Sequence, residues 1–127
     1  MDKRLHFGIF TSFTQGQWLG PNGTPDAAWD WPDGRYYIDI VRAFERACFD
    51  YVIFEDSLMV SDVYQGTAEV DLKHALHAPK QDPAALVALL AGYTEHIGLV
   101  PTLSTSFYPP YLLARLVSTL DSLSRGR

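Results

Sequence analysis

The sequence predicts an α/β fold in which parallel strands alternate with helices. Three short apolar segments, each bounded by polar residues, occur along the 127 residues and are typical of buried strands. A stretch with an apolar residue every three or four positions follows each of them, as expected of helices with one buried face. Because this alternation favours parallel pairing through right-handed crossovers, we expect a sheet in the order 1-2-3 with all carboxyl ends at one edge.

The first predicted strand is residues 5–10, LHFGIF, and its continuous apolar character indicates burial on both faces. A long loop rich in Gly, Pro, Asp and Trp follows it. The period then changes near Tyr36, and one helical stripe is formed by Tyr37, Val41, Phe44 and Cys48. Cys48 is thus expected to be an inert core thiol.

The second predicted strand is residues 51–55, YVIFE, and a long polar loop continues from it to Gln81. Asp82 and Pro83 supply an N-cap and a first-turn proline, so a second helix begins there. The apolar face expected for this helix consists of Leu86, Leu89, Leu90 and Tyr93.

The third predicted strand is residues 97–102, within HIGLVPT, and the segment LSTSFYPP separates it from a third helix that ends before SRGR. The buried face expected for that helix consists of Leu113, Leu116, Val117 and Leu120. The long strand-to-helix loops and tight helix-to-strand turns make the two edges of the sheet unequal, which favours a ligand site at the carboxyl edge.

Composition narrows the class of function. At 47% hydrophobic residues the chain can bury the core of one domain. A net charge of −5 with scattered Lys and Arg argues against nucleic acid as a partner, and no apolar run approaches the roughly 20 residues of a membrane span. A single cysteine cannot form an internal disulfide. We therefore expect a cytoplasmic protein that binds neither nucleic acid nor membrane.

Two segments carry a resemblance to a known family. FDYVIFEDS (49–57) and TEHIGLVPTLSTSFYPPYLLARLVSTLDSLSRGR (94–127) resemble the amino-terminal part of flavin-dependent monooxygenases of the bacterial luciferase-like superfamily. The similarity is to the nitrilotriacetate monooxygenase component A branch, which includes enzymes acting on aminopolycarboxylates and dibenzothiophene sulfone. The resemblance implies a TIM (β/α)8 barrel, with residues 1–127 as its first three βα units and the amino-terminal part of a single domain.

The resemblance also implies a function. The expected activity is oxygen insertion into a small organic amine, sulfur or polycarboxylate compound by reduced FMN and O2. A separate NAD(P)H-dependent flavin reductase would supply the cofactor as a transient partner, and the enzyme would be a homo-oligomer. The alternative is a non-catalytic fragment or assembly module without turnover. A stand-alone flavodoxin-like module is disfavoured because no strand is followed by a Gly-rich phosphate loop.

The cofactor-binding residues implied by the resemblance are Asp56, Thr102 and Ser104, whereas the catalytic residues stay open. A carboxylate and two hydroxyls suit the ribityl chain or the polar edge of the flavin ring; Asp56 capping local backbone and hydroxyls turning the chain are the structural alternatives. Since side chains alternate along a strand, we expect Glu55 to face the helix layer if Asp56 faces the site.

Several other residues invite a role. The tryptophans of the first loop, Trp18, Trp29 and Trp31, are expected to form a wall of the site or to pin that loop to the rim. Asp71, His74 and His77 have the spacing of one helical face, but nothing completes a metal set, so we expect a solvated loop and no metal. The sequence does not decide which way His6 points.

Overall fold

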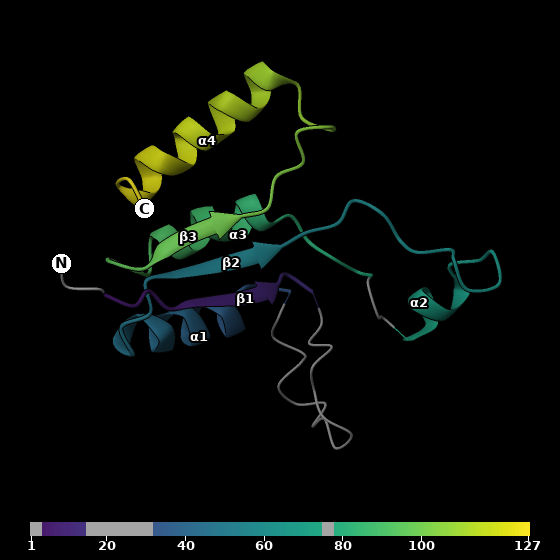
Figure 1. Cartoon of the computed structure of the whole chain (residues 1–127), viewed down its shortest axis with the longest axis horizontal. Coiled ribbons are helices and arrows are strands. Elements are labelled where there is room, and N and C mark those ends of the chain that lie inside the picture. The colour runs from purple at the N-terminus through teal and green to yellow at the C-terminus, as the bar shows by residue number, and fades with distance from the viewer. Residues whose placement is uncertain (1–3, 15–31, 75–77) are drawn as a thin grey trace.

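The computed structural model describes residues 4–14, 32–74 and 78–127, and within these ranges it contains one sheet of three strands. The strands are β1 (Gly8–Ser12), β2 (Tyr51–Glu55) and β3 (Gly98–Pro101). β2 pairs in parallel with both neighbours, in the order β1-β2-β3. All three arrowheads in Figure 1 point the same way, which confirms the predicted topology, although β1 begins three residues later than expected.

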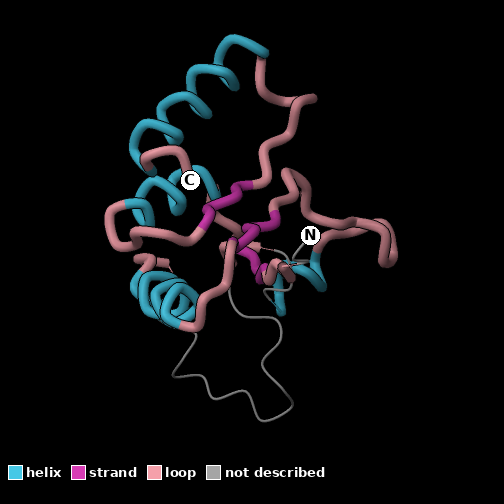
Figure 2. Tube along the Cα trace, turned by 60° about the vertical axis from the view of Figure 1, so that its left-hand side comes forward, coloured by secondary structure: helices cyan, strands magenta, loops and turns pink. Residues whose placement is uncertain are grey.

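Four helices connect and flank these strands in the described part of the chain: α1 (Arg35–Arg46), α2 (Glu69–His74), α3 (Pro83–Ala91) and α4 (Pro110–Ser124). Figure 2 shows α1, α3 and α4 on one side of the strands, while α2 lies apart from them, beyond the carboxyl ends. α2 interrupts the stretch that we expected to be loop throughout. No helix among the described residues is long and apolar enough to cross a membrane.

The core lies between the sheet and the helices that cover it. Val52 and Phe54 alternate along β2 and are fully buried. Leu99 of β3 is also buried, at 5% exposed. Each points toward the helix layer, where they pack in one cluster with Tyr37 and Val41 of α1. α3 adds Ala84, Leu86, Val87 and Leu90 to this cluster. The register of β2 is therefore fixed by which of its residues face the helices.

The opposite face of the sheet is uncovered. Phe10, Ile53 and Val100 lie in one row across the three strands, and Phe10 and Val100 are 69% and 42% exposed. The prediction that the first strand is buried on both faces is therefore wrong. We call this surface the inner face, because in a closed barrel it packs against side chains from the other strands. No such strands are present among the described residues.

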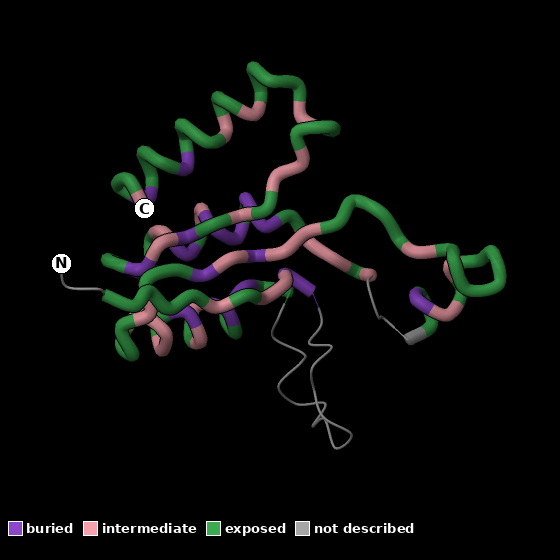
Figure 3. The backbone as a smooth tube through the Cα atoms, viewed as in Figure 1, coloured by how far each residue is buried: buried purple, intermediate pink, exposed green. Residues whose placement is uncertain are grey.

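Three expectations about helical residues are also corrected. Cys48 is exposed, because α1 ends at Arg46 and Cys48 adopts a left-handed conformation with φ of 60°. Tyr93 lies beyond the end of α3 and is half exposed, and Leu89 is exposed as well. Val117 of α4 is exposed too, since α4 packs beside α3 through Leu120 while much of its length stands clear of the sheet (Figure 3).

The amino edge of the sheet is held by polar contacts. The carboxylate of Asp50 accepts the Phe7 N–H at 2.7 Å and lies 3.1 Å from Nδ1 of His6. These contacts hold the pKa of Asp50 below its usual range, the Phe7 N–H contributing most. His6 is exposed here, at the end of the sheet opposite the strand-to-helix loops. We therefore assign it no part in the site at the carboxyl edge.

Candidate functional site

The carboxyl ends of β1 and β2 meet a segment that runs from Ala78 to Asp82. Thr14, just after β1, forms an antiparallel bridge with Lys80, and its hydroxyl donates to the Pro79 carbonyl at 2.7 Å. The Gln81 N–H donates to the Phe13 carbonyl at 2.9 Å. The long connection from Asp56 to Asp82, hereafter the excursion, therefore starts and ends at the carboxyl ends of the strands.

Asp82 ends this segment and begins α3, as the sequence predicts. One oxygen of its side chain accepts the Ala84 N–H at 2.8 Å, and Pro83 fills the first turn. The other oxygen lies 3.4 Å from the Tyr108 hydroxyl, from the loop before α4. Asp82 therefore links the start of α3 to the loop that follows β3.

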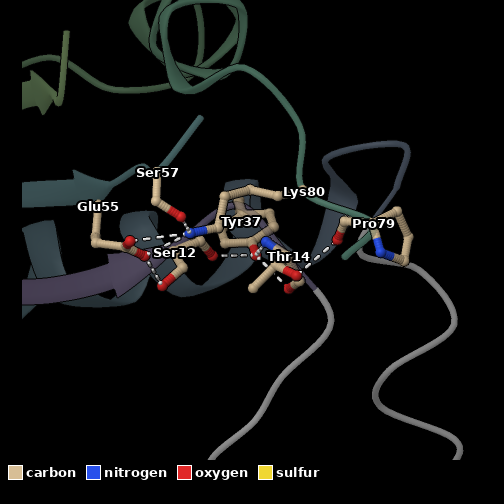
Figure 4. Close-up of polar contacts among 7 residues, drawn as sticks. All are labelled: Ser12, Thr14, Tyr37, Glu55, Ser57, Pro79 and Lys80. Atoms are coloured by element: carbon tan, nitrogen blue, oxygen red, sulfur yellow. Dashed lines mark hydrogen bonds and ion pairs between the residues drawn. The ribbon is translucent and has the colours of Figure 1, made fainter. Parts of the chain in front are cut away.

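Glu55 joins Ser12 and Lys80 in a polar network at this edge (Figure 4). The Lys80 ammonium donates to Oε1 and Oε2 of Glu55 at 2.9 and 3.1 Å, and to the Ser57 hydroxyl at 3.2 Å. The Ser12 hydroxyl donates to Glu55 Oε2 at 2.8 Å. Ser12 and Glu55 are register partners, and Glu55 alternates with the core residue Phe54. The prediction that Glu55 faces the helix layer is wrong: it lies on the inner face. Asp56 lies beyond the last residue of β2, so strand alternation does not set the direction of its side chain.

Tyr37 supports the end of β1 from the helix side. Its hydroxyl donates to the Ser12 carbonyl at 2.6 Å and accepts the Thr14 N–H at 3.2 Å. Burial raises the pKa of Tyr37 to about 12, so the hydroxyl keeps its proton. The network of Figure 4 thus fixes the backbone where β1 turns into its loop.

Asp56 lies immediately after this network and lines a pocket of about 440 Å³. The 56–60 loop and the 78–82 segment form its walls, with lining residues Asp56, Ser57, Leu58, Met59, Val60, Ala78, Lys80, Gln81 and Asp82. Burial raises the pKa of Asp56, with Asp82 and Glu55 adding to the effect, while Lys80 and the Ser57 N–H act against it. The pocket thus combines an apolar wall with a carboxylate whose charge depends on its neighbours.

The hydroxyl residues after β3 lie elsewhere along the same edge. The Thr102 N–H donates to the Phe54 carbonyl at 2.9 Å, which extends the parallel ladder and sets Thr102 beside Glu55. Thr102 is exposed, and by strand alternation it follows Val100 on the inner face. The Ser104 carbonyl accepts the N–H groups of Phe107 and Tyr108. Neither Thr102 nor Ser104 lines the pocket that contains Asp56.

The sequence reasoning missed Lys80, Ser12 and Tyr108. Ser12 could have been found by extending the first strand to its polar end, but Lys80 lies far from Glu55 in sequence and its pairing depends on the path of the excursion. The three tryptophans and His77 lie outside the described residues, so the roles predicted for them stay predictions. Asp71 is buried in α2, and among the described residues no group of His, Cys, Asp or Glu is arranged to hold a metal ion.

Comparison with known proteins identifies relatives of this arrangement. Dimethyl-sulfide monooxygenase from Hyphomicrobium sulfonivorans is 39% identical over 132 residues, covering 100% of this chain and 27% of that protein. Nitrilotriacetate monooxygenase component A from Aminobacter aminovorans is 41% identical over 135 residues, covering 99% of this chain and 28% of that protein. The chain therefore spans less than a third of the length of these relatives.

Solved structures agree. DmoA from Hyphomicrobium sulfonivorans superposes with a TM-score of 0.85 at 36% identity, over 98% of this chain and 27% of that chain. Riboflavin lyase RcaE, solved with modified FMN and riboflavin, superposes with a TM-score of 0.84 at 32% identity, over 98% of this chain and 28% of that chain. These neighbours confirm the predicted fold, the first βα units of a luciferase-like TIM barrel.

A family model described as luciferase-like monooxygenase matches residues 5–127. The match includes all three strands, the excursion that carries Lys80 and the segment that follows β3. Because it extends over nearly the whole chain and agrees with the named relatives, the chain belongs to the luciferase-like monooxygenase family.

Proposed function

We propose that the full-length gene product that contains this chain, hereafter the full-length product, is a reduced-FMN-dependent monooxygenase. Its substrate would be a small organic amine, sulfur or polycarboxylate compound, and residues 1–127 would be the amino-terminal part of its single barrel domain. The observation that carries the proposal is the family match over residues 5–127. The names of the relatives, a dimethyl-sulfide and a nitrilotriacetate monooxygenase, favour this substrate range.

The cofactor in this proposal is FMN, which a separate NAD(P)H-dependent flavin reductase delivers in its reduced form. The modified FMN in the RcaE structure supports a flavin, and the designation of a relative as component A supports a system of more than one protein. Reduced flavin supplies the activation of O2 when it is bound, so the protein has to bind, orient and shield it. We place the product in the cytoplasm, and we propose that it is a homo-oligomer.

Asp56, Thr102 and Ser104 are the cofactor-binding residues of this proposal. The donor set fits the ribityl hydroxyls or the polar edge of the ring, because a carboxylate accepts and a hydroxyl both donates and accepts. It does not fit the phosphate. Among the described residues that line the Asp56 pocket, Lys80 is the one cation, and its ammonium is engaged by Glu55. We therefore assign the phosphate to residues outside this pocket.

The test is oxygen incorporation by the full-length product. The protein is supplied with reduced FMN by a flavin reductase and NADH, under oxygen-18 gas, with thioethers, aromatic sulfones and aminopolycarboxylates as candidate substrates. The expected result is an oxidised product that carries one labelled oxygen atom. Failure of the full-length product to bind reduced FMN, measured anaerobically by equilibrium dialysis, would contradict the proposal whatever the substrate panel contains.

A further inference from the structure

Lys80 has one fixed position at the carboxyl edge. Its backbone is held by the bridge to Thr14, and the residues on either side of it are bonded to β1: the Pro79 carbonyl accepts from Thr14, and the Gln81 N–H donates to Phe13. The side chain is only 9% exposed. Its three N–H groups find three acceptor atoms, two on Glu55 and one on Ser57. The ammonium thus lies at the strand ends, held by three acceptor atoms.

This ion pair is partly buried, with the Lys80 side chain 9% and the Glu55 side chain 31% exposed, and its stability alone does not explain its presence. Removing an ammonium and a carboxylate from water costs about as much as their attraction returns, and apolar residues of similar volume often serve a core as well. What the Lys80–Glu55 pair does provide is a positive charge in a fixed place. That place adjoins Asp56, since Lys80 and Asp56 line the same pocket.

The electrostatic surroundings of Asp56 are mainly acidic. Among the described residues, four titratable groups act on it or are acted on by it: Glu55 from β2, Lys80 from the 78–82 segment, Asp82 from the start of α3 and Tyr108 from the loop before α4. Burial, Asp82 and Glu55 raise the pKa of Asp56, and Lys80 lowers it. The pKa of Tyr108 is itself raised, first by burial and then by Asp82 and Asp56. Lys80 is the one cation among these groups in the described part of the chain.

We propose that Lys80 is a positioning residue that keeps Asp56 ionised and therefore able to accept hydrogen bonds from the flavin. This inference rests on the proposed function, in which Asp56 binds the cofactor. Lys80 acts through charge and touches no cofactor itself, because its donors are used by Glu55 and Ser57. Glu55 holds Lys80 in place, yet its own negative charge works in the opposite sense on Asp56.

Because Lys80 and Glu55 have opposite effects on the pKa of Asp56, a test can separate a charge role of Lys80 from a purely structural one. Lys80→Gln and Glu55→Gln both break the same ion pair, so a purely structural role predicts that both weaken flavin binding in the same way. The charge role predicts opposite shifts. Loss of the Lys80 charge makes Asp56 easier to protonate. Loss of the Glu55 charge makes it harder, because the glutamine side chain keeps one oxygen that can accept from Lys80, and the Ser57 hydroxyl and the Thr14 bridge still hold Lys80 in place.

The experiment measures the affinity of the full-length product for reduced FMN, anaerobically, in a pH series that runs from neutral pH down to the lowest pH at which the protein stays folded. Affinity falls as the pH falls through the pKa of Asp56. In Lys80→Gln this fall begins at higher pH than in the wild type, with affinity about 3- to 10-fold weaker near the wild-type midpoint. In Glu55→Gln it begins at lower pH. Lys80→Arg, which keeps the charge, gives the wild-type profile.

Two further measurements separate the possible failures. Thermal unfolding of each variant shows whether the barrel still folds, and Asp56→Asn tests the flavin role of Asp56 directly. If Asp56→Asn weakens flavin binding but Lys80→Gln and Glu55→Gln move the profile in the same direction, the charge role of Lys80 is overturned. If Asp56→Asn leaves both the affinity and its pH profile unchanged, the assignment of Asp56 to the flavin is overturned instead.

Discussion

Glu45, near the end of α1, joins that helix to the turn before β3. Its Oε1 accepts three consecutive backbone N–H groups, from Glu95, His96 and Ile97, at 2.8, 2.7 and 3.0 Å. Burial acts to raise the pKa of Glu45, but these three donors outweigh it and the pKa lies below its usual value. One carboxylate oxygen therefore satisfies three backbone donors of the turn before β3.

The first prediction concerns this residue. Glu45→Ala leaves the three N–H groups without their acceptor and should lower the free energy of unfolding of the full-length product by about 1–3 kcal/mol. Chemical denaturation measures it, and Glu69→Ala, at an exposed position in α2, is the matched control. Equal stability of the two variants would contradict the structural role of Glu45.

The lowered pKa of Glu45 also fixes the sign of its pH dependence. A group whose folded-state pKa is depressed contributes stability above its unfolded value, about 4.3 for glutamate, and that contribution is lost as the pH falls through the folded value. The stability difference between the wild type and Glu45→Ala should thus be present at pH 7 and shrink below about pH 4. A difference that grew on acidification would be inconsistent with this account.

At the scale of elements, the start of α3 is well defined. Asp82 caps the helix through the Ala84 N–H, and its other oxygen lies near Tyr108. Our second prediction is that Asp82→Ala lowers the free energy of unfolding by about 1 kcal/mol, whereas Asp82→Asn, which retains a capping oxygen, costs less. Urea denaturation of both variants provides the measurement, and a larger loss for Asp82→Asn than for Asp82→Ala would refute the capping role.

The elements also show which parts of the fold could be predicted from the sequence. The strand–helix alternation and the Asp82–Pro83 signal were enough for the parallel order and for the start of α3. The sequence did not predict which side chains of β2 face the helices, because residues 51–54 are all apolar and either set of alternate residues could pack there. Only packing of Val52 and Phe54 against α1 and α3 decides it, and that choice sends Glu55 to the inner face.

The site depends even more on contacts between distant residues. Asp56 was singled out because it directly follows the predicted strand 51–55, which is a local signal. Lys80 was not found, because it meets Glu55 only after the excursion returns to the strand ends, 25 residues later in sequence. Cys48 was misplaced for a local reason, since a helical period continued past Arg46 ignores the end of α1.

At the scale of the whole molecule, the described chain leaves much apolar surface open. The inner face exposes Phe10 and Val100. On the other side, a pocket of about 250 Å³ lies between α4 and β3, lined in part by Leu99, Leu103 and Val117. Both surfaces are those that further βα units would cover in a closed barrel, and unpaired strand edges with apolar faces promote association.

Our third prediction is that the isolated 127-residue chain self-associates. Val100→Lys, on the inner face, should reduce that association by placing a charge on the exposed row. It should also prevent folding of the full-length product, because a closed barrel would bury the same position. Val63→Lys, at an exposed loop position, should do neither. Light scattering of the isolated chain and circular dichroism of the full-length product measure the two effects. A monodisperse, cooperatively unfolding wild-type monomer would show that the chain is complete as a fold.

We propose that the carboxyl edge of this sheet binds reduced flavin through Asp56, and the affinity of the full-length product for reduced FMN tests this proposal most directly. At neutral pH, Asp56→Ala should weaken binding by roughly 2- to 30-fold, the cost of a lost hydrogen bond with or without an unpaired partner. Asp39→Ala, at an exposed position on α1, should leave it unchanged. Equal affinities for the wild type and Asp56→Ala, with both proteins folded, would contradict the claim.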